Sequence, residues 1–218
     1  MSDLTVIIPH KPTPANDAAL EINLAALHDN ASCGLEVVVD DSMPGDPYDI
    51  WNRRIAELPK GRIVVMTNSD VIMGPRWDAG FLKHIQDQAI LTGYIVEPGS
   101  IGVADANIRR DFGRLPHTFD RKAFEAFVEN EMARTPDLKI ERAWYMPCCL
   151  YRDFFVWTKG FNLSGGGFPR ALDIEYWERC IKHLPNFKLL RVNSWSYHFQ
   201  NLSYLEASRA RGDVSRYV

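Results

Sequence analysis

The sequence predicts an α/β fold, a single Rossmann-like domain with a mostly parallel central sheet and helices on both faces. Short runs of β-branched and aliphatic residues recur at 4–9, 35–39 and 63–66, and such runs are typical of buried parallel strands. Segments with apolar residues three and four positions apart lie between these runs, as amphipathic helices require. Polar residues follow the end of each run, which is where ligands bind in open α/β sheets.

Length and composition are those of one globular domain. The chain has 218 residues, of which 46% are hydrophobic and 24% charged, so we expect one folded unit over residues 1–218. The net charge of −3 argues against a protein that binds nucleic acid or membranes over its whole surface. No secretory signal or transmembrane segment is visible. The four cysteines lack the spacing of a zinc site, which predicts a cytoplasmic protein with reduced thiols.

Further helices and strands follow from the same patterns. Leu20, Leu24 and Leu27 predict the buried face of a first helix, which Asn16 would cap. In a late helix that begins near residue 171, a stripe predicts the buried face, formed by Ile174, Trp177, Ile181 and Leu184. The other expected strands lie at 90–96, where Gly93 interrupts the run, and at 144–151, 189–192 and 194–199. The other expected helices lie at 48–58, after Gly74-Pro75 and after Asp120.

The stretch from Ile63 to Asp70 joins a buried strand to two oxygen-bearing side chains. Side chains alternate along an extended chain, so Asn68 and Asp70 would point to one side and Ser69 away from it. A hard divalent cation needs oxygen ligands and keeps waters and substrate phosphates in the rest of its shell. The stretch therefore predicts a metal or phosphate site. The alternative is a turn in which Asp70 is a local cap.

Asp40 and Asp41 follow the second predicted strand. Acidic residues at this place accept hydrogen bonds from the base or ribose of a nucleotide. The alternative is a loop with a local cap, because the turn-forming residues 44–47 come next.

A second group of candidate residues surrounds a glycine-rich loop. Gly166 and Gly167 lie in a segment that lets the backbone approach a ligand closely. The loop leads to Asp173 at the start of a helix, and Glu175 does not share its helical face. We therefore expect Asp173 to point into the site, or else to stabilise the helix dipole.

The last predicted strand and a basic segment supply further candidates. Alternation places His198 opposite Trp195 and Tyr197, where it would bind a metal or phosphate or be a structural histidine. The segment 97–117 is loop-rich and basic, with Arg109, Arg110 and Arg114. It would form a wall of an acceptor site or a solvated face.

Taken in order, these stretches resemble family 2 glycosyltransferases of the GT-A fold, and the resemblance covers nearly the whole chain. It rests on five features: the strand ending at Pro9, the segment Val37–Ser42, Asn68-Ser69-Asp70, Gly160-Phe161 with the glycine loop before Asp173-Ile174-Glu175, and Tyr197-His198.

The resemblance implies an inverting hexosyl- or pentosyltransferase that uses a nucleotide-sugar donor, above all a UDP-sugar, and Mn²⁺ or Mg²⁺. Residues 1–96 would bind the donor, and residues 97–218 would bind the acceptor and supply the catalytic residue. The resemblance implies that Asp40 and Asp41 bind the base, that Asp70 and His198 bind the cation, and that Asp173 is the catalytic base. We also expect donor contacts from Pro9, His10 and Asn68, and acceptor contacts from Gly166, Gly167, Glu175 and Arg110.

Two positions depart from the family pattern, because Asn68 and Leu172 stand where relatives commonly have acids. A non-catalytic module that binds sugar nucleotides or glycans is therefore the main alternative. A nucleotidyltransferase is disfavoured, because the first strand is not followed by a glycine-rich phosphate loop. The acceptor stays open between a glycan, a phosphorylated lipid, a protein and a hydroxylated nucleic acid.

Overall fold

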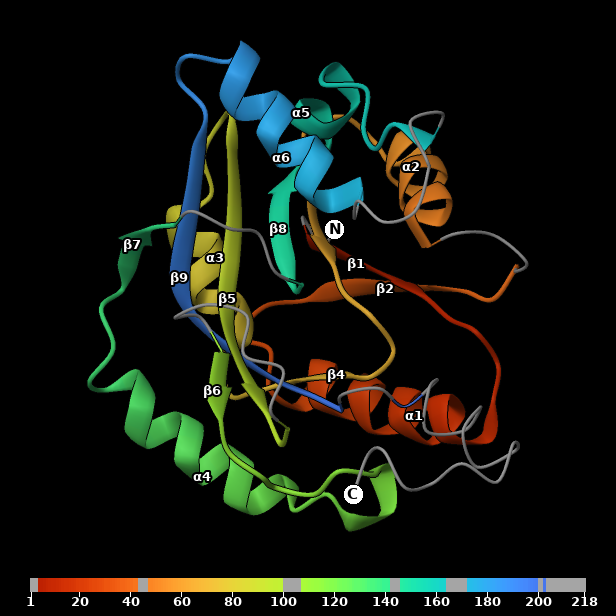
Figure 1. The fold of residues 1–218 in the computed structure, drawn as a ribbon, viewed down its shortest axis with the longest axis vertical. Helices are drawn as coiled ribbons and strands as arrows, with labels where there is room; N and C mark the ends of the chain where they lie inside the picture. The colour runs from red at the N-terminus through yellow and green to blue at the C-terminus, as the bar shows by residue number, and fades with distance from the viewer. Residues whose placement is uncertain are drawn as a thin grey trace.

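The computed structural model describes residues 4–42, 47–99, 107–141, 146–163, 172–199 and 202. Its strands are β1 (Leu4–Pro9), β2 (Leu35–Asp40), β3 (Ile63–Met66), β4 (Val71–Met73), β5 (Ala89–Glu97), β6 (Asn107–Arg109), β7 (Leu138–Ile140), β8 (Cys148–Tyr151) and β9 (Lys188–His198). Its helices are α1 (Pro14–Asp29), α2 (Pro47–Glu57), α3 (Trp77–His84), α4 (Arg121–Met132), α5 (Arg152–Trp157) and α6 (Leu172–His183), with a 3₁₀ turn η1 (Pro116–Thr118). The strands form a sheet in the order β2-β1-β3-β8-β5-β9-β4, with β6 beside β5 and β7 beside β9 (Figure 1).

Most strands of this sheet run in the same direction. β1 pairs in parallel with β2 and β3. β8 is antiparallel to both β3 and β5, so β5 runs the same way as β3. β6 and β9 are parallel to β5. The carboxyl ends of β1, β2, β3, β5, β6 and β9 therefore lie at one edge of the sheet, which we call the carboxyl edge, and the predicted mostly parallel sheet is confirmed.

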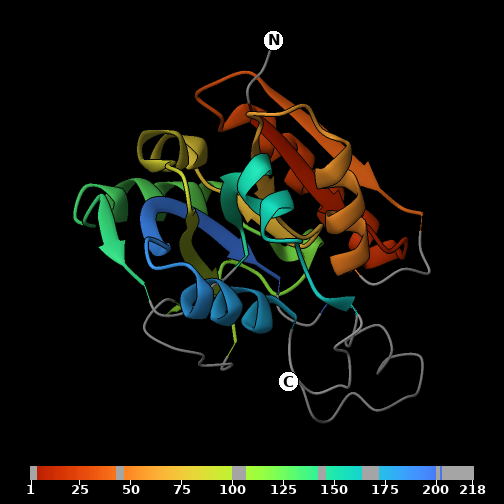
Figure 2. The same cartoon turned by 90° about the horizontal axis from the view of Figure 1, so that it is seen from above.

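Alternating residues of the strands fill two hydrophobic layers. Ile7, Val64 and Met66 pack with α2, α5 and α6. Their neighbours Val6 and Val65 pack instead with α1 and α3. Figure 2 shows α3 and α6 on opposite sides of β5 and β9. The predicted helices on both faces are confirmed.

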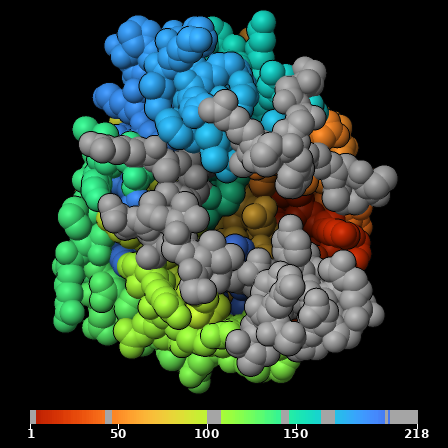
Figure 3. Space-filling model, viewed as in Figure 1, coloured from red at the N-terminus to blue at the C-terminus, as the bar shows by residue number. Residues whose placement is uncertain are grey.

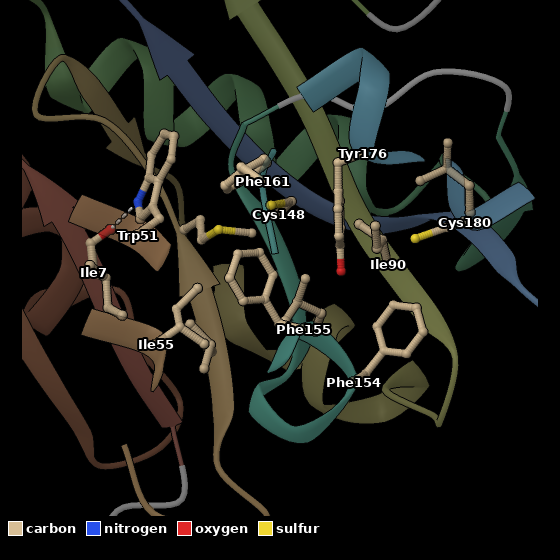
Figure 4. Packing of buried hydrophobic residues seen from close by; sticks show 14 residues of the cluster. Ile7, Trp51, Ile55, Ile90, Cys148, Phe154, Phe155, Phe161, Tyr176 and Cys180 are labelled. Carbon is tan, nitrogen blue, oxygen red and sulfur yellow. Dashed lines mark hydrogen bonds between the residues drawn. The ribbon is translucent and has the colours of Figure 1, made fainter. Parts of the chain in front are cut away.

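Aromatic side chains join α6 to the rest of the first layer (Figure 4). The Trp51 indole of α2 donates a hydrogen bond to the carbonyl of Ile7, at 3.3 Å. The ring of Phe161 lies 5.3 Å from the rings of both Phe155 and Tyr176, between centroids. The Tyr176 hydroxyl is hydrogen-bonded to the Thr158 hydroxyl at 2.6 Å. These contacts hold α6 against α5 and Phe161.

The predicted buried face of α6 is correct for Trp177 and Leu184, which pack partly buried against the first layer, and wrong for the other two residues. Ile174 and Ile181 are 39% and 52% exposed, whereas Tyr176 and Cys180 are buried. The sequence of α6 carries two apolar stripes, and spacing alone does not rank them. The stripe with Tyr176 faces the core, because this ring finds both aromatic neighbours and a hydrogen-bond partner for its hydroxyl.

Smaller differences concern the ends and the number of elements. α1 begins at Pro14, and Thr13 rather than Asn16 is its cap, because the Thr13 hydroxyl accepts a hydrogen bond from the Asn16 N–H.

The strands expected at 189–192 and 194–199 form one strand, β9. β4, β6, β7 and α5 were not predicted, since elements of three to six residues are too short to show a period. The helices expected after Gly74-Pro75 and after Asp120 are α3 and α4; α3 begins at Trp77, and the Asp120 side chain caps α4. Among the described helices, none has the length and apolar character to span a membrane.

Candidate functional site

The carboxyl edge of the sheet brings most of the predicted site residues together. They lie at or shortly after the ends of different strands: Pro9 and His10 at β1, Asp40 and Asp41 at β2, Asn68 and Asp70 at β3, and His198 at β9. In Figure 3 the surface is hollowed between α6 and the first strands, and the visible floor carries the colours of residues near β3 and β8.

Asp70 lies in a tight turn that joins β3 to β4. The turn is closed by the Val71 N–H, which donates to the Asn68 carbonyl at 3.3 Å. Asn23 of α1 donates its side-chain amide to the same carbonyl at 3.1 Å, and the Phe199 N–H donates to the Asp70 carbonyl at 3.0 Å. Ser69 is buried while Asn68 and Asp70 are half-buried. The segment is therefore a turn, the alternative that the sequence left open, and its backbone is fixed from two sides.

His198 lies between two carboxylates. Its Nε2 is 3.5 Å from Oδ2 of Asp70, and its Nδ1 is 2.7 Å from Oε1 of Glu97. Burial by itself lowers the pKa of His198, but the charges and hydrogen bonds of Asp70 and Glu97 outweigh it and raise this pKa from 6.5 to about 10. In the protein without a metal, His198 is therefore a cation at neutral pH.

The Asp70–His198 pair has the geometry for two ligands of one divalent cation. Metal–ligand distances of about 2.0–2.2 Å place adjacent ligand atoms about 3 to 3.5 Å apart, and the pair is 3.5 Å apart. Glu97 holds the other ring nitrogen of His198, as a carboxylate commonly does for a metal-binding histidine. The described residues contain no group of three or more His, Cys, Asp or Glu side chains that would hold a metal alone. The pair thus fits a cation that takes its remaining ligands from substrate and water.

Asp40 is occupied by partners within the protein. Its carboxylate accepts hydrogen bonds from the Ser42 N–H at 2.9 Å and from Arg54 at 2.5 Å and Arg53 at 3.1 Å. Burial raises the pKa of Asp40, but Ser42 and Arg54 together lower it from 3.8 to about 2. Asp41 is exposed. Of the two predicted base contacts, Asp41 is thus the carboxylate that faces solvent.

His10 and Pro9 are part of the same edge. Pro9 lies beside Asp40 in the register of β1 and β2, and the His10 N–H donates to the Asp40 carbonyl at 2.8 Å. The ring of His10 is only 6% exposed, and its Nε2 is 2.8 Å from Asp17 of α1. Its Nδ1 is buried and has no partner in the described residues.

Asp173 lies at the start of α6 and contacts α2. Burial raises its pKa above 3.8, although hydrogen bonds from the Ile174 N–H and the Tyr48 hydroxyl act in the opposite direction. Tyr48 is in the first turn of α2, the helix that follows β2. Because β2 ends at the carboxyl edge, this contact brings Asp173 toward the same edge as Asp41 and Asp70.

Solved structures, TarS and GalNAc-T7 among them, share this arrangement of strands and helices, whereas no family model and no curated protein matches the chain. The structure of residues 1–349 of TarS from S. aureus matches with a TM-score of 0.55 and 12% identity, over 100% of this chain and 66% of that one. The structure of GalNAc-T7 with UDP, GalNAc and Mn²⁺ matches with a TM-score of 0.53 and 13% identity, over 91% of this chain and 44% of that one. Both are glycosyltransferases of the GT-A fold. The chain adopts the GT-A fold. It spans less than two thirds of the length of either GT-A protein.

Within this GT-A fold, Glu175 and Arg110 have partners inside the protein. Glu175 is 2.9 Å from Arg179, which donates to the carbonyls of Thr158 and Gly160 at 2.5 Å. The Arg110 guanidinium lies over the rings of Phe127 and Phe112, at 4.7 and 5.5 Å. The predicted acceptor residues Gly166 and Gly167 lie outside the described residues.

Glu97 and Tyr48 contact proposed site residues, and sequence reasoning missed both. A signal for Glu97 exists, since it directly follows the strand predicted at 90–96 and thus occupies the same strand-end position as Asp40. Tyr48 has no such signal, because its contact with Asp173 joins residues far apart in the chain.

Proposed function

We propose that the protein is a metal-dependent glycosyltransferase that moves a sugar from a nucleoside-diphosphate donor, a UDP-sugar, to a hydroxyl group. The observation that carries this proposal is the contact between Asp70 and His198 at the carboxyl edge of a GT-A sheet. The related fold of GalNAc-T7, crystallised with UDP and Mn²⁺, supports the donor class and the cation. We infer a donor site over β1 and β2 and a reaction site toward β9 and α6.

The donor's nucleoside would lie over the ends of β1 and β2. Asp41 is exposed there and would accept hydrogen bonds from the base or the ribose. His10 and the adjacent Pro9, at the end of β1, would contact the same part of the donor. Asp40, held by Arg53 and Arg54, would fix the backbone that carries Asp41.

The diphosphate would bind at the turn after β3. Asp70 and His198 would hold a divalent cation, Mn²⁺ or Mg²⁺, which when bound neutralises negative charge on the departing diphosphate. Glu97 would keep the imidazole of His198 in its orientation. The side-chain amide of Asn68 would contact the phosphate groups at this turn.

Asp173 would be the general base. A carboxylate must remove the proton of the acceptor hydroxyl while this oxygen attacks the anomeric carbon. Burial raises the pKa of Asp173, which strengthens it as a base. A direct displacement of this kind inverts the configuration of the sugar. The acceptor would approach along α6, near Glu175, and Gly166 and Gly167 stay predicted acceptor contacts.

The test is donor turnover by the full chain with a panel of nucleotide sugars and Mn²⁺ or Mg²⁺, in hydrolysis and in transfer. For one donor, Asp173→Asn is expected to lower turnover by about 10²-fold or more while donor affinity changes little. Glu178→Gln removes the same charge from α6 and is the matched control.

Equal turnover in Asp173→Asn and wild type would contradict the role of Asp173. Donor binding with no turnover by the wild type, for any donor and acceptor, would favour the non-catalytic module instead.

A further inference from the structure

β6 carries a basic residue into the row of strand ends that holds His198. It is a three-residue strand that lies beside the last residues of β5 (Figure 1). Its register pairs Arg109 with Glu97, and β5 in turn pairs Val96 with Tyr197 of β9. One residue further on, Glu97 meets His198 through the 2.7 Å contact. Arg109, Glu97 and His198 therefore form one row across three adjacent strands.

The side chains of this row point away from α4. Ile108, Val96 and Tyr197 pack in the hydrophobic cluster that includes Phe124 and Val128 of α4. Side chains alternate along strands, and laterally paired residues share a face. Arg109 therefore lies on the face of Glu97 and His198. Because parallel strands are about 4.8 Å apart, the Cα of Arg109 lies roughly 10 Å from that of His198.

Arg110, the arginine expected from the sequence to contact the acceptor, lies elsewhere. Its guanidinium covers Phe127 and Phe112 on the α4 side. Arg109 is exposed, and its guanidinium forms no ion pair or hydrogen bond in the part of the chain that the structure describes. Of these two neighbouring arginines, Arg109 is thus the one whose donors are available to a ligand in the row.

A phosphate bound at this row needs a positively charged partner, because the row contains carboxylates. Asp70 and Glu97 are two carboxylates around one imidazole, and carboxylates repel a phosphate oxyanion. An arginine is permanently charged and presents five N–H donors in a fork that matches phosphate oxygens. Its long side chain and a diphosphate bound near His198 together span the separation of about two strands.

We propose that Arg109 binds a phosphate group of a substrate at the end of the Arg109–Glu97–His198 row. The proposal rests on the proposed function, and the phosphate belongs either to the donor's diphosphate or to a phosphorylated acceptor. In either case Arg109 determines specificity for a phosphate group. It does so in addition to the metal site that Asp70 and His198 form.

The experiment has two arms, both on the full chain. In the first, equilibrium dialysis measures the affinity for UDP in the presence of Mn²⁺. In the second, the same protein saturated with UDP and Mn²⁺ is titrated with inorganic phosphate. Arg109→Ala is compared with the wild type and with Arg114→Ala, which loses the same charge from an exposed pair with Asp111. Circular dichroism checks that both variants are folded.

We expect Arg109→Ala to weaken one of these two affinities about tenfold, as for the loss of a charge-assisted hydrogen bond, and Arg114→Ala to stay within about twofold. A loss in the first arm assigns the phosphate to the donor, and a loss confined to the second assigns it to the acceptor. Wild-type affinities in both arms for a folded Arg109→Ala would overturn the proposal while leaving the proposed function intact. A wild type that does not bind UDP with Mn²⁺ would overturn both.

Discussion

At the end of β9, the contacts of His198 determine how the site responds to protons. Its ring lies between Asp70 and Glu97, so in the protein without a metal a proton takes the place that the proposed cation would take. Protons and the cation therefore compete for Nε2 of His198, and we expect metal affinity to rise with pH. Strand alternation predicted where the His198 side chain points. It did not predict its partners, because Glu97 comes from β5 and Asp70 from the turn between β3 and β4.

The raised pKa of His198 predicts a pH dependence of stability. In the folded state it is about 10, against 6.5 as the ordinary value. The ion pairs of His198 therefore stabilise the fold fully below about pH 6.5, and this contribution is lost as the pH rises through about 10. Urea unfolding of the metal-free protein between pH 6 and 10 measures it. We expect the difference in unfolding free energy between wild type and His198→Gln to shrink over this range.

The control for this prediction is His117→Gln, since His117 is exposed and its replacement should leave the pH dependence unchanged. A constant difference between wild type and His198→Gln across the range would show that His198 is not held as a cation.

The pairing of β5 with β9 shifts in register between Thr92 and Tyr94, and Gly93 lies at this shift. A Cβ atom at this position would lie 2.6 Å from the Ser194 carbonyl oxygen, so the backbone would have to move. We expect Gly93→Ala to lower the free energy of unfolding by about 1–3 kcal/mol. Chemical denaturation measures it.

Gly34→Ala is the matched control for Gly93→Ala. A Cβ atom at Gly34 would meet no atom within 4 Å, so this change should stay within about 0.5 kcal/mol. Equal effects of the two substitutions would show that β5 and β9 do not approach as closely as described.

At the scale of elements, the sequence was informative where one apolar pattern dominates. The runs of β1, β2 and β3 have a single interpretation, and their polar ends give the carboxyl edge with Asp41 and Asp70. The buried face of α6 was predicted only in part because two stripes compete, and the rings of Phe155 and Phe161 favour the stripe with Tyr176. β6 was missed because three residues show no period, and the position of Arg109 in the row was missed with it.

For the whole molecule, the two hydrophobic layers share one sheet. Trp51 lies in one layer and Trp77 in the other, and the strands between them contribute to both. We therefore propose that residues 1–96 and 97–218 fold as a single cooperative unit. Thermal unfolding followed by tryptophan fluorescence and by far-ultraviolet circular dichroism should give coincident transitions. Two separate transitions would show that the halves are independent.

The order of the strand-end residues in the sequence predicted the GT-A fold and most of the proposed donor site. This was possible because ligands of α/β sheets bind at the carboxyl ends of strands, so the position of each residue follows from the strand before it. The contacts of Glu97 with His198 and of Tyr48 with Asp173 depend on the folded chain as a whole. They are the part of the site that only the structure supplies.

The most direct test of the account is isothermal titration of the full chain with UDP, in Mn²⁺ and in chelator, for wild type, Asp70→Ala and His198→Ala. The account predicts that wild type binds UDP in Mn²⁺, that chelator weakens this binding strongly, and that both substitutions remove the dependence on Mn²⁺. UDP binding that is the same with Mn²⁺ and with chelator, or the same in Asp70→Ala and wild type, would contradict the central claim that Asp70 and His198 hold the diphosphate through a cation.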